Sequence, residues 1–162
     1  MPESLFKENI KRTNLECRTL QPRDAASLGA FFSELVENGD DSLFHPHGFG
    51  QVDADRICSN NGIDAYYAVF NSGEILGYGL LRGWDEGYDI PSVGIAIGKK
   101  ARGLGLGKMM MGFLHNAAKK AGATQVRLKV YKNNTAAIRL YEALGYRLED
   151  HDDSQYLGII EL

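Results

Sequence analysis

Three glycines at alternate positions are the feature of this sequence most suited to chemistry. Gly103, Gly105 and Gly107 lie between an apolar, strand-like segment, residues 90–97, and a long amphipathic segment. The first amides of a helix have no intrahelical acceptor, and the helix dipole favours negative charge beside them. Glycine also lets the backbone come close to a phosphate. The pattern therefore predicts a phosphate-binding loop at the start of a helix.

The spacing does not fit two common phosphate-binding loops. A Walker A loop ending at Gly107-Lys108 would need glycine in place of Arg102 and serine or threonine in place of Met109. A G-x-G-x-x-G dinucleotide loop starting at Gly103 would need its third glycine where Lys108 stands. What remains is R-x-x-G-x-G, beginning at Arg102. Taken alone, it also fits a flexible connector between a strand and a helix.

A second motif begins at Asn134. Asn134, Ala137 and Tyr141 stand at positions i, i+3 and i+7, so they share one face of the helix expected over residues 134–144. Taken alone, this segment also fits an amphipathic helix in which Asn134 is the N-cap and Tyr141 fills the edge of the core.

Together the two motifs resemble those of the GNAT superfamily of N-acetyltransferases, which bind acetyl-CoA. R-x-x-G-x-G is similar to the family's pyrophosphate loop. The segment from Asn134 to Tyr146 looks like its second CoA motif, N-x-x-A-x-x-L-Y-x-x-x-G-F/Y. The resemblance implies that acetyl-CoA contacts the strand before the loop, the loop itself and one helix face: Ile95, Ala96, Ile97, Arg102, Gly103, Leu104, Gly105, Leu106, Gly107, Lys108, Asn134, Ala137 and Tyr141.

The order of predicted elements is β-α-α-β-β-β-α-β-α-β(-β), which is also the order of the GNAT fold. Strands are expected at 15–20, 65–70, 75–81, 90–97, 126–131 and 156–160, and the two motif helices at 107–121 and 134–144. We expect an α/β (α+β) fold, a GNAT-like mixed, mostly antiparallel sheet of six to seven strands with helices on both faces. Residues 1–162 are expected to form a single GNAT-type N-acetyltransferase domain.

The resemblance implies direct transfer of an acetyl group from the thioester to an amine in a ternary complex. In the family, a backbone N–H on the bulged strand before the loop polarises the thioester carbonyl, and Gly94 suits such a bulge. Tyr141 matches the family's acid, which protonates the leaving thiolate. Many family members place a glutamate base on this strand or the next. Here residues 90–98 hold no carboxylate and the next strand offers Lys129, so we expect Asp89 to be the base.

Two loops are expected to contact the acceptor. One contains His45 and His47, and the other contains Trp84, Asp85 and Glu86. Carboxylates and aromatic rings suit a cationic or sugar-like acceptor, although the second loop also fits a solvated turn. The two histidines have no carboxylate or cysteine spaced to complete a metal site, so we expect no metal.

Composition narrows the partners further. The net charge of −3 creates no basic field that would recruit nucleic acid, and no apolar run approaches the length of a membrane span. Cys17 and Cys58 form no Cys-x-x-Cys pair and are expected to be free thiols in a reducing, cytoplasmic compartment. We expect a monomer or homodimer that acetylates a small-molecule amine, such as an amino sugar or polyamine. The alternatives are a protein or peptide N-acetyltransferase and a non-catalytic acyl-CoA-binding module.

Overall fold

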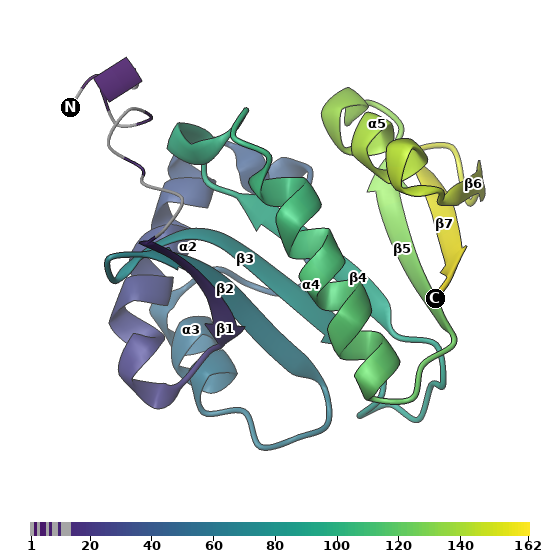
Figure 1. Ribbon diagram of the computed structural model, residues 1–162, viewed down its shortest axis with the longest axis horizontal. Coiled ribbons are helices and arrows are strands. Elements are labelled where there is room, and N and C mark those ends of the chain that lie inside the picture. The colour runs from purple at the N-terminus through teal and green to yellow at the C-terminus, as the bar shows by residue number, and fades with distance from the viewer. Residues whose placement is uncertain (1, 3, 6, 8–9, 11–13) are drawn as a thin grey trace.

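A mixed sheet forms the centre of the protein (Figure 1). The computed structural model describes residues 2, 4, 5, 7, 10 and 14–162. Within them, seven strands run in the order β1-β2-β3-β4-β5-β7-β6, and every neighbouring pair is antiparallel except β4 and β5. The strands are β1 Leu15–Thr19, β2 Ala65–Asn71, β3 Glu74–Arg82, β4 Ser92–Ile97, β5 Gln125–Tyr131, β6 Arg147–Asp150 and β7 Gln155–Glu161. The predicted mostly antiparallel sheet is confirmed.

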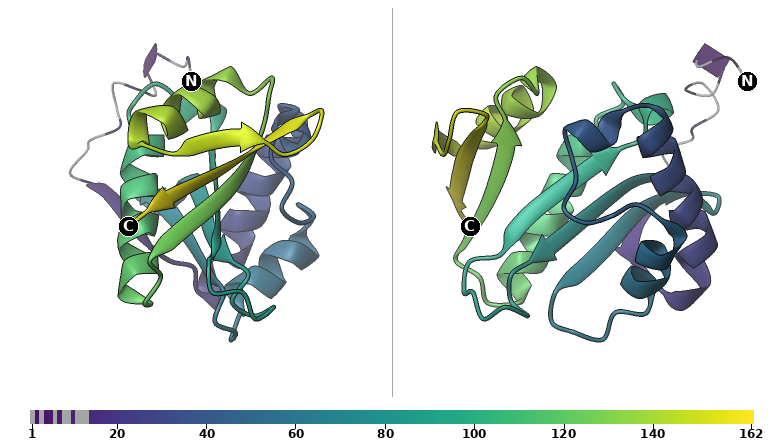
Figure 2. Two further views of the ribbon diagram at one scale, coloured as in Figure 1. Left: turned by 90° about the vertical axis from the view of Figure 1, so that its right-hand side faces the viewer. Right: turned by 180° about the vertical axis from the view of Figure 1, so that it is seen from behind.

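Helices cover both faces of this sheet, as the sequence predicts (Figure 2). Helices α2 (Ala25–Glu37) and α3 (Gln51–Cys58) pack on one face, whereas α4 (Leu106–Lys120) and α5 (Thr135–Leu144) pack on the other. Short 3₁₀ helices lie between these elements at η2 Pro22–Asp24, η3 Asp40–Ser42 and η4 Lys99–Ala101. Among the described residues, no helix is long and apolar enough to cross a membrane.

Side chains alternate between the two faces of the sheet along each strand, which divides the core into two main clusters. On β3, Tyr78 and Leu80 belong to the cluster under α2 and α3, whereas Leu81 belongs to the cluster under α4. On β4, Val93 packs with the α4 cluster. Each strand residue near the centre of the sheet can therefore be assigned to the α2/α3 face or to the α4/α5 face.

The sheet opens between its two parallel strands. Within the described chain, β4 and β5 pair only at Ser92 and Arg127, where the Arg127 amide donates to the Pro91 carbonyl at 3.0 Å. The strands then diverge toward the start of α4 (Figure 1). The bulge predicted at Gly94 is wrong, because β4 pairs with β3 without a shift in register. Gly94 instead makes room for Phe44, whose ring carbon would lie 3.0 Å from a Cβ at this position.

Candidate active site

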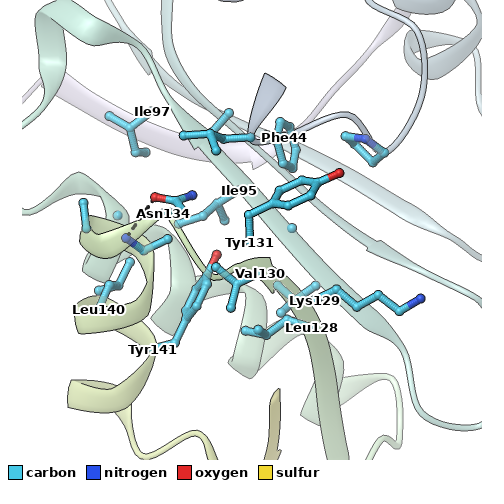
Figure 3. A pocket seen from close by; sticks show the side chains of 18 of the residues that line it. Phe44, Ile95, Ile97, Leu128, Lys129, Val130, Tyr131, Asn134, Leu140 and Tyr141 are labelled. Carbon is cyan, nitrogen blue, oxygen red and sulfur yellow. Dashed lines mark hydrogen bonds between the residues drawn. The ribbon is translucent and has the colours of Figure 1, made fainter. Parts of the chain in front are cut away.

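A cleft of about 760 Å³ follows the opening between β4 and β5. Its lining includes Ile95 and Ile97, which belong to the α4 side of the core, and Phe44, which packs on the α2/α3 side. The cleft therefore connects the two faces of the sheet at the point where β4 and β5 separate (Figure 3). Two reactants could thus enter from opposite faces and meet between the strands.

The glycine loop forms the end of this cleft nearest α4. Gly103 and Gly105 have φ values of 78° and 79°, in the left-handed region that other residues adopt at a cost of about 1–2 kcal/mol each. Gly105 is the N-cap of α4, and among the described residues no side chain caps that helix. Gly107 has no such φ, but a Cβ there would lie 3.3 Å from the Leu140 side chain, which would have to shift by a few tenths of an ångström. The loop thus brings the first residues of α4 to the lining of the cleft. Phosphate binding by their amides stays a prediction.

Arg102 is held beside the loop by two contacts. Its Nε donates to the Ile97 carbonyl at 3.1 Å, and its Nη2 lies 2.8 Å from Asp40 Oδ2 in η3. Lys108 in the first turn of α4 also lines the cleft. The Arg102 guanidinium therefore fixes the end of β4 to η3, with its charge already paired.

The register of β4 decides which of its amides face the opening. The Pro91 carbonyl points toward β5. Backbone groups point to the same side at every second residue of a strand, so those of Ile95 and Ile97 also point toward β5. The amide of Gly98 donates to the Leu76 carbonyl of β3 at 2.8 Å, as this alternation requires. Of the three predicted β4 contacts, Ile95 and Ile97 thus present amides to the gap, whereas the amide of Ala96 faces β3.

One face of α5 borders the same opening. Asn134, Ala137 and Tyr141 all line the cleft, as their helical spacing predicts. The Asn134 carbonyl oxygen accepts the Ala137 amide at 3.3 Å, so Asn134 is also the N-cap. Burial raises the pKa of Tyr141 to about 12, and only 7% of this residue is exposed. Its hydroxyl points toward the gap beside Asn134 (Figure 3).

The two histidines of the first predicted acceptor loop have different surroundings. His45 lines the cleft, and its Nε2 lies 2.6 Å from the hydroxyl of Tyr131, so it bridges the loop to β5. His47 instead hydrogen-bonds to the buried Tyr78 hydroxyl at 2.8 Å and packs against Phe32. Burial lowers the pKa of His47. The predicted acceptor contact by His47 is at odds with this position in the aromatic core.

The predicted residues of the second acceptor loop do not line the cleft, although the centre of the neighbouring Tyr88 ring lies 5.0 Å from the guanidinium carbon of the cleft residue Arg127. Trp84 and Asp89 line a separate hollow beside residues 121–124, just after the C-terminus of α4. The Asp85 carboxylate accepts the amides of Ile63 and Asp64 at 2.7 and 3.1 Å, which ties the loop to the chain before β2. Glu86 is exposed in the adjacent turn.

This placement has a physical cause. The loop precedes the first residue of β4, whereas the gap opens at the other end of that strand. The distance from the gap is at odds with the base role predicted for Asp89. The acceptor contacts predicted for Trp84, Asp85 and Glu86 are at odds with a cleft lining that includes none of these three residues. In the described part of the chain, moreover, no three His, Cys, Asp or Glu side chains gather as metal ligands.

Several cleft residues were not singled out by the sequence as acceptor contacts. They come from the loop between η3 and α3, the end of β3, the start of β4 and alternate positions of β5: Phe44, Arg82, Ser92, Arg127, Lys129 and Tyr131. The alternation on β5 could have indicated three of them, because the odd-numbered positions 127, 129 and 131 are polar or aromatic and lie between buried aliphatic residues. Their common face could be predicted, but not the loop that covers it.

These features define an α/β protein whose mixed sheet opens beside an uncapped helix start. The comparison with known families agrees with this class. Residues 32–146 match the acetyltransferase (GNAT) family, and the chain therefore belongs to that family of acyltransferases. The glycine loop, the open β4 edge and α5 together fit its use of acetyl-CoA.

Known proteins resemble the chain at modest identity. Over 113 residues it is 25% identical to the spermine/spermidine N(1)-acetyltransferase of Bacillus subtilis, covering 63% of this chain and 74% of that protein. The structure of a GCN5-related N-acetyltransferase from Kribbella flavida matches with a TM-score of 0.78 and 19% identity, over 94% and 100% of the two chains. PaiA N-acetyltransferase from Thermoplasma acidophilum, solved with coenzyme A, matches with a TM-score of 0.75 and 17% identity, over 91% and 99%. These two structures show the shared fold.

Proposed function

We propose that this enzyme transfers the acetyl group of acetyl-CoA to a primary amine of a small molecule, by direct attack in a ternary complex. The supporting observation is the cleft that crosses the sheet between β4 and β5, with the α4 N-terminus at one end and polar side chains at the other. The B. subtilis relative is named for acetylation of small amines, which agrees with a small acceptor. The product would be an amide and free CoA.

In this proposal the α4/α5 side holds acetyl-CoA. The amides around Gly105 bind the pyrophosphate, because oriented N–H groups at a helix start favour an anion. Asn134 and Ala137 border the pantetheine chain, with Ala137 small enough to let it pass. The amides of Ile95 and Ile97 lie along the open edge of β4, where they can donate to the acetyl carbonyl as its oxygen gains charge.

In this proposal two side chains move protons. The pKa of Tyr141, raised to about 12 by burial, keeps its phenol protonated at neutral pH, so it can donate to the leaving thiolate. On the acceptor side, His45 and Tyr131 form a hydrogen-bonded pair within the cleft. Histidine is the side chain best suited to take a proton near neutral pH, so we assign the removal of the amine proton to His45.

The test is thiol release from acetyl-CoA by the purified chain with a panel of amines. We expect turnover with at least one small amine, and loss of most kcat in His45→Gln with the Kd for CoA preserved. Turnover on peptides alone would replace this proposal with protein acetylation. CoA binding without turnover on any amine would leave only an acyl-CoA-binding role.

A further inference from the structure

The charged side chains lining the cleft are unevenly distributed by sign. Five cationic residues line it, and Asp40 is the one carboxylate among the described lining residues. The cations are Arg82, Arg102, Lys108, Arg127 and Lys129. The whole chain carries a net charge of −3, so its average composition does not explain this excess of positive charge. Asp40 pairs with Arg102 beside the glycine loop, which leaves the rest of the cleft without a negative side chain.

Three of these cations lie far from the phosphate-binding loop. Arg82 pairs in register with Ser92, and Ser92 pairs with Arg127, so these residues form one row across β3, β4 and β5. Lys129 lies two residues further along β5, on the same face. The row is at the first residue of β4, and the glycine loop follows the last one. Five steps of about 3.3 Å separate these ends by roughly 17 Å.

The row is therefore too far from the loop to bind the same pyrophosphate. It also faces the other reactant. Arg82 follows Leu80 by two positions, and Leu80 packs in the α2/α3 cluster, which places this row on the face opposite α4. That face is the one covered by Phe44 and His45, the acceptor side of the proposed reaction.

Existing contacts hold the two arginines in place without neutralising them. Arg82 Nη1 donates to the Pro46 carbonyl at 2.7 Å, and Arg127 Nε donates to Ser92 Oγ at 2.9 Å. In the part of the chain that the structure describes, neither arginine nor Lys129 forms an ion pair with a carboxylate. An arginine has five N–H donors, so each keeps donors for a ligand while its direction is fixed.

From this arrangement, which rests on the proposed function, we infer that the acceptor is an amine that also carries an anionic group, bound by Arg82, Arg127 and Lys129. A carboxylate or a phosphate would satisfy the same donors. A polyamine would instead bring further positive charge against an unpaired cationic row. On this point the chain differs from what the name of its B. subtilis relative suggests.

The register also limits the shape of this acceptor. Ser92 pairs with Arg127, so Ile95 lies at about the level of Val130, three steps and roughly 10 Å from the row. Arginine and lysine side chains shorten that span. The reacting amine and the anionic group should therefore be separated by several bonds, as in lysine acetylated at its ε-amine or in glucosamine 6-phosphate.

The experiment compares matched amines with the full-length chain and acetyl-CoA. Lysine against cadaverine tests a carboxylate, and glucosamine 6-phosphate against glucosamine tests a phosphate. We expect kcat/KM to be at least about tenfold higher for the anionic member of one pair, the scale of a charge-assisted hydrogen bond. The double variant Arg127→Gln/Lys129→Gln should remove this preference and leave the Kd for CoA unchanged. Arg147→Gln on exposed β6 is the matched control and should keep the preference.

A preference for cadaverine and glucosamine, or a preference that survives the double variant, would overturn the inference. If no compound turns over, the proposed function fails separately, and calorimetry in the presence of CoA decides the anion site. Binding of lysine or glucosamine 6-phosphate alone, lost in the double variant, supports the inference. Equal binding of both members of each pair, or binding of neither, overturns it.

Discussion

A negative charge at Gly105 should abolish CoA binding while the fold survives. Gly105 has a φ of 79°, and a Cβ built there meets nothing within 4 Å, so a side chain fits but the backbone is strained. A non-glycine residue in this conformation costs about 1–2 kcal/mol. For a domain of this size each kcal/mol lowers Tm by about 2–4 °C, so Gly105→Glu should lower Tm by about 2–8 °C.

The effect on CoA affinity should be much larger than this strain. Gly105 is the N-cap of α4, so a glutamate there places its charge where the pyrophosphate is proposed to bind. Two unit charges about 4 Å apart repel by about 4 kcal/mol at an effective dielectric constant near 20. Every 1.4 kcal/mol changes an affinity about tenfold, so the Kd for CoA should rise by about 10²- to 10³-fold, allowing for screening by solvent.

Isothermal titration of CoA into each variant measures this change, with circular dichroism to verify folding. Gly105→Gln has the same strain and nearly the same size without the charge, so it should retain more affinity than Gly105→Glu. Gly73→Glu places the same substitution in the β2–β3 turn, at a φ of 87° with open space around its Cβ. It should lose stability but bind CoA normally. A folded Gly105→Glu variant with wild-type affinity would refute the assignment of the glycine loop.

Three further predictions address the reaction, the pH dependence and the β4 surface. Tyr141→Phe should lower kcat by about 10²-fold with little change in the Kd for CoA, and stopped-flow thiol release measures both; an unchanged kcat would remove its role as acid. Burial lowers the pKa of His47 in the folded state, so the unfolded state binds the extra proton first. Stability should therefore fall as pH drops through about 6.5, and less steeply in His47→Gln, as thermal unfolding between pH 5 and 8 would show. Gly94→Ala should push the Phe44 ring by a few tenths of an ångström and raise the acceptor KM alone, and Phe44→Leu in the same chain should restore it; unchanged kinetics in the single variant would disprove this contact.

The elements with strong periodicity were predictable from the sequence. The predicted helix over residues 107–121 is α4, Leu106–Lys120, because its apolar residues repeat at helical spacing and Gly122 follows with a positive φ. The short strand β6, Arg147–Asp150, was hard to predict, because its four residues are mostly exposed and polar. A strand with this composition is recognisable only from its partner β7, which the sequence alone does not reveal.

The acceptor side of the cleft was predicted less well, for two geometric reasons. His45 and His47 are two residues apart in a loop, where no regular alternation decides which side chain faces the cleft and which faces Tyr78. Asp89 is close in sequence to β4, but it precedes the strand, and the gap opens at the opposite end. Choosing the base by its closeness in sequence to β4 therefore selected a residue at the end of this strand that lies away from the gap.

The topology explains why the cofactor side was easier to predict. Parallel strands need a crossover connection, usually a helix, and here α4 leads from the end of β4 to the start of β5. The helix must therefore start at the end of β4, which is also the end where the two strands have separated. The open edge of β4 and the helix start proposed to bind phosphate therefore come from one continuous segment, the end of β4 and the start of α4. The cationic row of Arg82, Ser92 and Arg127 depends instead on three strands meeting in register, so its chemistry became visible only when the sheet was assembled.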